Sequence, residues 1–176
     1  MSVEHVTIRR ARTSDVIHIR RLVDEFSGEG RVLSKSTVNL YEDIQEFRVA
    51  EADNGAQRTV VGCGALHVLW EDLAEVRTVA VDPVAQGHGV GHRIVAELLS
   101  TARELGVRRV FCLTFETRFF GRHGFRPIQG TPVSPRVYEE LLRSYDEGVA
   151  EFLDLERVKP NTLGNTRMLL SLDEGA

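Results

Sequence analysis

The segment EVRTVAVDPVAQGHGVGHRIVAELLSTARELG, residues 75–106, holds the pattern around which the chain is organised. It opens with β-branched residues that favour a strand, which the dipeptide Asp82-Pro83 interrupts. Three glycines at alternate positions follow in residues 86–91, directly before a segment with helical periodicity. The apolar face predicted for this helix comprises Ile94, Val95, Leu98, Leu99, Ala102 and Leu105. Gly106 is predicted to end the helix, so the segment predicts a strand, a glycine turn and a helix in succession.

The glycine turn, residues 86–91 (QGHGVG), has the features of a phosphate-binding loop. Glycine lets the backbone approach a ligand closely, and the first N–H groups of a helix lack partners at its positive end. The turn lacks the Gly-Lys-Ser/Thr of a Walker loop and the G-x-G-x-x-G spacing of a dinucleotide fingerprint. It therefore predicts a site for a phosphate or pyrophosphate, with a purely structural turn as the alternative.

The composition excludes several classes of function. A chain of 176 residues is long enough for one domain with a substantial core. A net charge of −4 with interspersed signs provides no surface for nucleic acid or membrane. Cys63 and Cys112 have no C-x-x-C spacing, which favours reduced thiols, and the N-terminus has no apolar signal-peptide region. We therefore expect a single cytoplasmic domain over residues 1–176.

The periodicity of the other segments predicts a mixed α/β fold. Strands are expected near residues 6–8, 47–52, 59–70, 109–115 and 125–128, and at the apolar end of residues 158–172. Helices are expected at residues 16–26, 117–123 and 137–142, and in a segment where Leu40, Tyr41, Ile44 and Phe47 share one face. Gly62 and Gly64 suggest a bulge in the strand that contains them.

Two motifs resemble the GCN5-related N-acetyltransferase (GNAT) superfamily. Gln86, Gly89 and Gly91 stand as in its motif Q/R-x-x-G-x-G/A after a V-x-P strand end, and residues 119–125 (FFGRHGF) resemble its second signature. The resemblance implies a mixed α/β fold with a central, mostly antiparallel sheet flanked by helices. It also implies a parallel, splayed strand pair at the cofactor site. Acetyl-CoA is the implied co-substrate, held by its pyrophosphate on loop amides.

The same resemblance assigns the residues that contact the cofactor. They are Val79, Val81, Gln86, Gly87, His88, Gly89, Val90, Gly91 and Phe120. The Val79 amide would face the acetyl carbonyl, and Val81 would lie nearer the pantetheine arm. His88 and His92 are spaced i, i+4 but have no third ligand nearby, so no metal is expected.

The resemblance narrows to the N-acetylglutamate synthase family. It rests on residues 29–33 (EGRVL) with Lys35, residues 73–76 (LAEV), and Asn161, Gly164 and Asn165 in the tail. It implies acetylation of the α-amine of glutamate or glutamine by direct attack, the first step of arginine biosynthesis. Many members carry a preceding amino-acid-kinase domain, which is not expected here. A homodimer is compatible with the resemblance.

The resemblance also proposes residues for the reaction and the acceptor. Glu75 occupies the place of a general base acting through water, and with Val79 it is the predicted catalytic residue. The alternative is that Glu75 and Arg77, on one face of the strand, pair with each other or with solvent. An amino-acid acceptor requires basic or polar groups for its carboxylates. The candidates are Lys35, Arg77, Thr114, Lys159 and Asn161.

One position departs from the family. Phe120 stands where the usual general acid is a tyrosine, and it has no proton to give. A thiol with a pKa of about 8.5 is a fair leaving group without help, and water or Tyr145 could substitute. Two alternatives therefore remain: acetylation of another amine, such as a peptide N-terminus or an antibiotic, and a catalytically idle acyl-CoA sensor.

Overall fold

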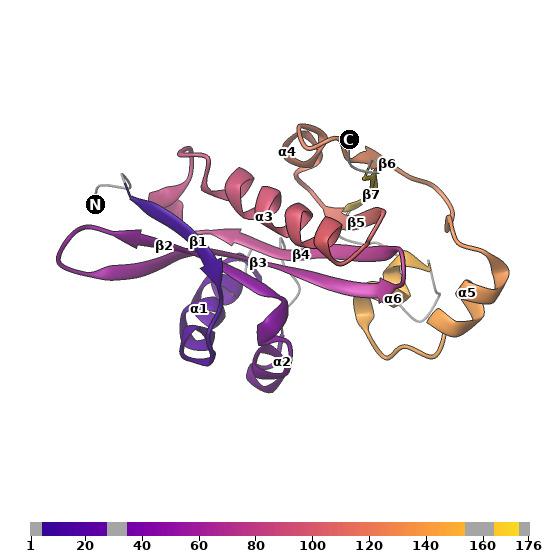
Figure 1. Ribbon diagram of the computed structural model, residues 1–176, viewed down its shortest axis with the longest axis horizontal. Coiled ribbons are helices and arrows are strands. Elements are labelled where there is room, and N and C mark those ends of the chain that lie inside the picture. Colours follow the sequence, from indigo (N-terminus) through magenta and orange to yellow (C-terminus); the bar gives the residue numbers. More distant parts are fainter. Residues whose placement is uncertain (1–4, 28–34, 154–163, 173–176) are drawn as a thin grey trace. The chain divides into compact units, whose positions relative to one another are not determined.

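The computed structural model describes residues 5–27, 35–153 and 164–172 (Figure 1). The strands are hydrogen-bonded in the order β1-β2-β3-β4-β5-β7-β6, and the described pairings are antiparallel except for β4 with β5. The expected mixed α/β class, with a mostly antiparallel sheet and one parallel pair, is confirmed. The chain divides into two compact units. Unit 1 comprises Met1–Leu66 and Val76–Thr101, and unit 2 comprises His67–Glu75 and Ala102–Ala176.

The first helix of unit 1 follows the predicted periodicity. After β1 (Val6–Arg10) and the 3-10 turn η1 (Thr13–Asp15), helix α1 runs over Val16–Ser27. Its buried residues are Val16, Ile19, Leu22, Val23 and Phe26, which are the predicted apolar face. They join the core cluster of unit 1, because residues at i, i+3, i+4 and i+7 lie on one side of a helix.

The helix predicted after α1 is shorter than expected. Helix α2 covers only Thr37–Glu42, and the 3-10 turn η2 (Ile44–Glu46) follows after Asp43. Phe47 begins β2 (Phe47–Asp53), which confirms the strand predicted over residues 47–52, and pairs with Ala65, while Tyr41 is 51% exposed. Pairing with the sheet therefore overrides the helical periodicity at Phe47.

Strand β3 (Arg58–Trp70) contains the predicted irregularity. Ala50 pairs with Gly62 but Glu51 pairs with Val60, so β3 has one extra residue at this point. A Cβ added at Gly62 or Gly64 would lie 2.9 or 2.7 Å from a side-chain carbon of Ile94. The two glycines thus let the helix that carries Ile94 lie directly against the strand.

The central segment has the predicted order of elements. Strand β4 spans Leu73–Val81, the 3-10 turn η3 spans Pro83–Ala85, and helix α3 spans Val90–Glu104. Gly106 has φ +84° and donates its N–H to the carbonyl of Arg103, which confirms it as the end of the helix. Leu105 is 59% exposed, so its predicted place on the apolar face is wrong because α3 has already ended.

Unit 2 is built on β5 (Arg109–Thr114). Its first residues are parallel to the start of β4, with Leu73 opposite Arg109 and Glu75 opposite Phe111. On its other side lies β7 (Thr166–Ser171), which also pairs with the short β6 (Arg126–Pro127). Three helices complete the described elements of the unit: α4 (Thr117–Gly121), α5 (Pro135–Leu141) and α6 (Glu147–Phe152).

Helix α6 was not predicted from the sequence. The side chain of Asp146 accepts a hydrogen bond from the N–H of Val149 and thereby caps it. Val149 and Phe152 join the core cluster of unit 2, where the Phe152 ring meets Phe111 edge-on at 4.9 Å. In the part of the chain that the structure describes, no helix is long and apolar enough to cross a membrane.

Candidate functional site

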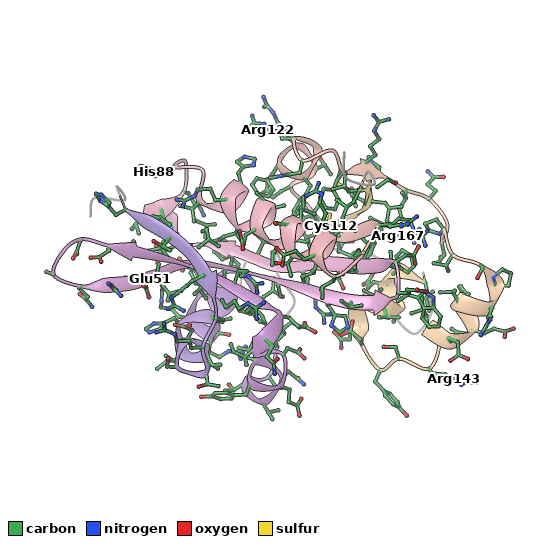
Figure 2. All side chains as sticks on the ribbon, in the orientation of Figure 1. Glu51, His88, Cys112, Arg122, Arg143 and Arg167 are labelled. Atoms are coloured by element: carbon green, nitrogen blue, oxygen red, sulfur yellow. The ribbon has the colours of Figure 1, made fainter. Side chains whose placement is uncertain are left out.

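The glycine turn leaves its backbone exposed ahead of α3, where Figure 2 marks His88. Gly87 and Gly89 have φ values of +79° and +74°, which L side chains rarely adopt. A Cβ at either position would meet nothing within 4 Å. Glycine is therefore required by the left-handed backbone conformation and not by a lack of space. The N–H of Arg93 donates to the carbonyl of Gly89 at 3.1 Å. The first N–H groups of an α-helix have no acceptor within it, so the turn that leads into α3 suits an anion.

Hydrogen bonds from side chains stabilise the backbone of this turn. The Nε2 group of Gln86 donates to the carbonyl of Val81 at 3.1 Å, and Nδ1 of His88 lies 2.9 Å from the carbonyl oxygen of Gln86. Asp82 accepts from the N–H of Val84 at 3.1 Å and pairs with Arg21 of α1 at 2.8 Å. Because the polar ends of Gln86 and His88 turn back to the backbone, the amides remain the groups that suit a ligand.

Thr78 is a feature of β4 that sequence reasoning missed. Its φ of +58° is left-handed, and it is 8% exposed. A β-branched residue in this conformation costs about 1–3 kcal/mol and marks a site where the surroundings impose the geometry. Its carbonyl accepts from Sγ of Cys63 at 3.5 Å, and burial raises the pKa of that thiol to about 12, which keeps the donor proton in place. Thr78 directly precedes Val79, the predicted contact of the acetyl carbonyl, and no pattern in the sequence signalled it.

Two basic residues of unit 1 that are candidates for binding the acceptor, Lys35 and Arg77, lie beside the same short turn. Nζ of Lys35 lies 3.9 Å from Oδ2 of Asp43, and Nη2 of Arg77 lies 3.7 Å from Oε2 of Glu46. Asp43 precedes η2 and Glu46 is its last residue, and the N–H of Glu46 donates a hydrogen bond to the carbonyl of Asp43. The side chain of Lys35 is 18% exposed and that of Arg77 is 10% exposed. The sequence named both cations but not the acidic turn that brings them together.

Glu75 is buried in unit 2, with 3% of its surface exposed. A Cβ added at Gly148 of α6 would collide with its Oε2 atom and would lie 3.0 Å from Oδ1 of Asp146. Both carboxylates therefore face the same small space beside Gly148. Burial, reinforced by the charge of Glu75, raises the pKa of the Cys112 thiol, so Cys112 is a poor thiolate.

The remaining candidates of unit 2 have structural contacts of their own. Phe120 is 6% exposed, and its ring meets Phe119 and Phe125 edge-on at 5.0 and 5.4 Å. Oγ1 of Thr114 accepts from the N–H of Glu116 at 2.8 Å and so closes the turn after β5. Tyr145, considered as a substitute acid, is 98% exposed.

Two candidates cannot be placed. Lys159 and Asn161 lie outside the described residues, as do residues 29–33. Within the described ranges, no three His, Cys, Asp or Glu side chains form a group that could hold a metal ion.

Known sequences resemble this chain over most of its length. The Acetyltransferase (GNAT) family profile matches residues 19–125. An amino-acid acetyltransferase of Mycobacterium tuberculosis is 62% identical over 165 residues, which cover 94% of each chain. An amino-acid acetyltransferase of Neisseria meningitidis serogroup A is 35% identical over 123 residues, which cover 69% of this chain and 27% of that one.

Solved structures share the same architecture. A Mycobacterium tuberculosis protein in complex with CoA and NLQ matches with a TM-score of 0.90 and 62% identity, over 95% of this chain and 99% of that one. N-acetylglutamate synthase from Neisseria gonorrhoeae, complexed with coenzyme A and N-acetyl-glutamate, matches with a TM-score of 0.75 and 25% identity. That match covers 98% of this chain and 36% of the synthase. The chain described here therefore belongs to the GNAT acetyltransferase family.

Proposed function

We propose that this protein transfers the acetyl group of acetyl-CoA to the α-amine of L-glutamate or L-glutamine, the first step of arginine biosynthesis. The main support for an amino acid as the acceptor is the 62% identity, over 94% of the chain, to an amino-acid acetyltransferase. The CoA and N-acetyl-glutamate bound by the related synthase support the cofactor and the acceptor. A single domain over residues 1–176, a cytoplasmic location and a homodimer stay predictions.

The glycine turn supports binding of the acetyl-CoA pyrophosphate. Its exposed glycines lie directly before α3, where the backbone N–H groups are at the positive end of a 15-residue helix. In the proposal, the Val79 N–H polarises the acetyl carbonyl and Val81 contacts the pantetheine arm. Donors placed in advance at a carbonyl oxygen stabilise the charge that develops when an amine attacks it.

Glu75 is the proposed general base. The acceptor arrives as an ammonium and must lose a proton before its nitrogen can attack. The new C–N bond then forms, the C–S bond breaks, and the departing thiolate takes up a proton to leave as CoA thiol. Because the pKa of Cys112 is raised, direct attack is favoured over a covalent acyl-enzyme.

Gly148→Ala tests the position of Glu75. The new Cβ would collide with the Glu75 carboxylate, whose displacement we expect to lower kcat by roughly 10²-fold. The melting temperature should change little, because alanine favours a helix over glycine by about 1 kcal/mol and the end of a glutamate side chain can move. Gly121→Ala in α4 is the matched control, since a Cβ there meets nothing within 4 Å. Wild-type kcat in Gly148→Ala would contradict the placement of the base.

Lys35 and Arg77 are proposed to bind the carboxylates of the acceptor, because they are the candidate cations that the structure brings to η2. Lys35→Ala should therefore raise KM for the amino acid by at least about tenfold, the usual order for a charge-assisted hydrogen bond, and leave KM for acetyl-CoA unchanged. Steady-state kinetics with each substrate varied in turn measures this. Arg58→Ala is the control, because Arg58 forms an exposed ion pair with Asp53 at the β2–β3 turn. An unchanged amino-acid KM would remove Lys35 from the acceptor site.

The function itself is tested by release of free CoA thiol from acetyl-CoA. Glutamate, glutamine, aspartate, lysine and a short peptide are offered in turn to the purified protein. Turnover strongest with glutamate or glutamine supports the proposal. Turnover with the peptide or lysine alone would assign a different amine, and acetyl-CoA binding without any turnover would assign a sensor.

A further inference from the structure

The proposed reaction leaves one proton to be disposed of in every cycle. An ammonium acceptor loses two protons on becoming an amide; the departing thiolate takes one of them, and the other must reach solvent. If Glu75 accepts a proton, it must lose it again before the next turnover. With 3% of its surface exposed, Glu75 has little direct access to water.

A second carboxylate lies beside it. Oε2 of Glu75 and Oδ1 of Asp146 both lie within 3.0 Å of the point where a Gly148 Cβ would stand. The absence of a side chain at Gly148 allows both carboxylates to approach this point. Asp146 is also the N-cap of α6, which accepts from the N–H of Val149 at 3.1 Å and holds the carboxylate in place.

A histidine lies next to Asp146. Nε2 of His67, on β3, lies 3.7 Å from Oδ2 of Asp146. The side chain of His67 is 22% exposed and that of Asp146 is 24% exposed, so both are more accessible to solvent than Glu75. Imidazole exchanges protons readily near neutral pH, and a single water can bridge a gap of this length.

We propose that Asp146 and His67 form the route by which the proton taken up by Glu75 leaves the protein, an inference that rests on the proposed function. The proton passes from the Glu75 carboxyl group to the Asp146 carboxylate, then to the imidazole of His67, and from there to solvent. Neither residue needs to touch the substrate. Glu75, Asp146 and His67 belong to unit 2, as does Cys112, whose thiol pKa is raised by burial and by the charge of Glu75.

Asp146→Asn separates this role from the capping role. Asparagine caps a helix as well as aspartate does, so the melting temperature should stay unchanged, but an amide cannot carry the proton. With the best acceptor, we expect kcat to fall at least about tenfold, within the range seen when a proton-transfer group is lost, and KM for both substrates to stay unchanged. Glu147→Gln, an exposed neighbour at the start of α6, removes the same charge and should leave kcat alone.

His67→Ala distinguishes proton transfer from a structural role. Free imidazole added to this variant should restore kcat in proportion to its concentration, because a small buffer can carry the proton instead. A loss of kcat that imidazole does not restore, or wild-type kcat in Asp146→Asn, would overturn the route.

A measurement without turnover keeps the route testable if the proposed function fails. The ring chemical shifts of His67, measured by NMR at one fixed pH, should change in Asp146→Asn and in Glu75→Gln, but not in Glu147→Gln. Unchanged ring shifts in both variants would show that the three side chains do not form a connected route and would overturn it. Absence of turnover by the wild-type protein, with every acceptor, would instead overturn the proposed function.

Discussion

Glu75→Gln is expected to lower kcat by roughly 10²–10⁴-fold, the usual contribution of a positioned general base. Glutamine fills the same buried space beside Gly148 but cannot take a proton from the acceptor. The affinity for acetyl-CoA, measured by calorimetry, should stay at the wild-type value because the glycine turn is untouched. The kcat/KM profile should also lose the acid limb that reports protonation of the base.

The control for this variant is Glu71→Gln. Glu71 is exposed and precedes β4, so its amide form should leave both kcat and the pH profile unchanged. A Glu75→Gln enzyme with a wild-type pH profile would show that another group, or water alone, serves as the base. The burial of Glu75 would then have a structural explanation, and Gly148 would be small for packing reasons only.

Gly89→Asp is expected to weaken acetyl-CoA binding by about 30-fold or more. Left-handed backbone costs an ordinary L residue about 1–2 kcal/mol, and a carboxylate placed against the pyrophosphate adds charge repulsion of the order of another kcal/mol or more. The φ of +74° at Gly89 and its position before α3 place both effects at the same residue. Titration calorimetry with acetyl-CoA, or with CoA itself, measures the loss.

Two companion variants separate the causes of that loss. Gly89→Asn tolerates the left-handed conformation and has no charge, so its difference from Gly89→Asp isolates the repulsion. Gly55→Asp in the β2–β3 turn introduces the same carboxylate at a glycine of φ +83° with open space around it. It should leave acetyl-CoA binding unchanged. Unaltered affinity in Gly89→Asp would show that the glycine turn is structural and that the cofactor binds elsewhere.

Local features of the chain could be predicted from the sequence because they depend on near neighbours. The apolar face of α1, the strand and helix on either side of the glycine turn, and the helix end at Gly106 all appear as expected. Burial of one side of a helix produces a periodic pattern of apolar residues in the sequence, and a left-handed turn usually requires a glycine. The errors at Phe47 and Leu105 arise where a strand pairing or a helix end interrupts the period.

The candidate residues themselves were named from motifs, but their surroundings were not. The chain by itself determined the glycine turn and the identities of Glu75, Lys35 and Arg77. Only the tertiary structure revealed the left-handed Thr78, the meeting of Lys35 and Arg77 at η2, and the placement of Asp146 and Gly148 beside Glu75. The reason is physical: periodicity reports which side of one element is buried, whereas the partner across that surface is a residue tens of positions away that only packing selects.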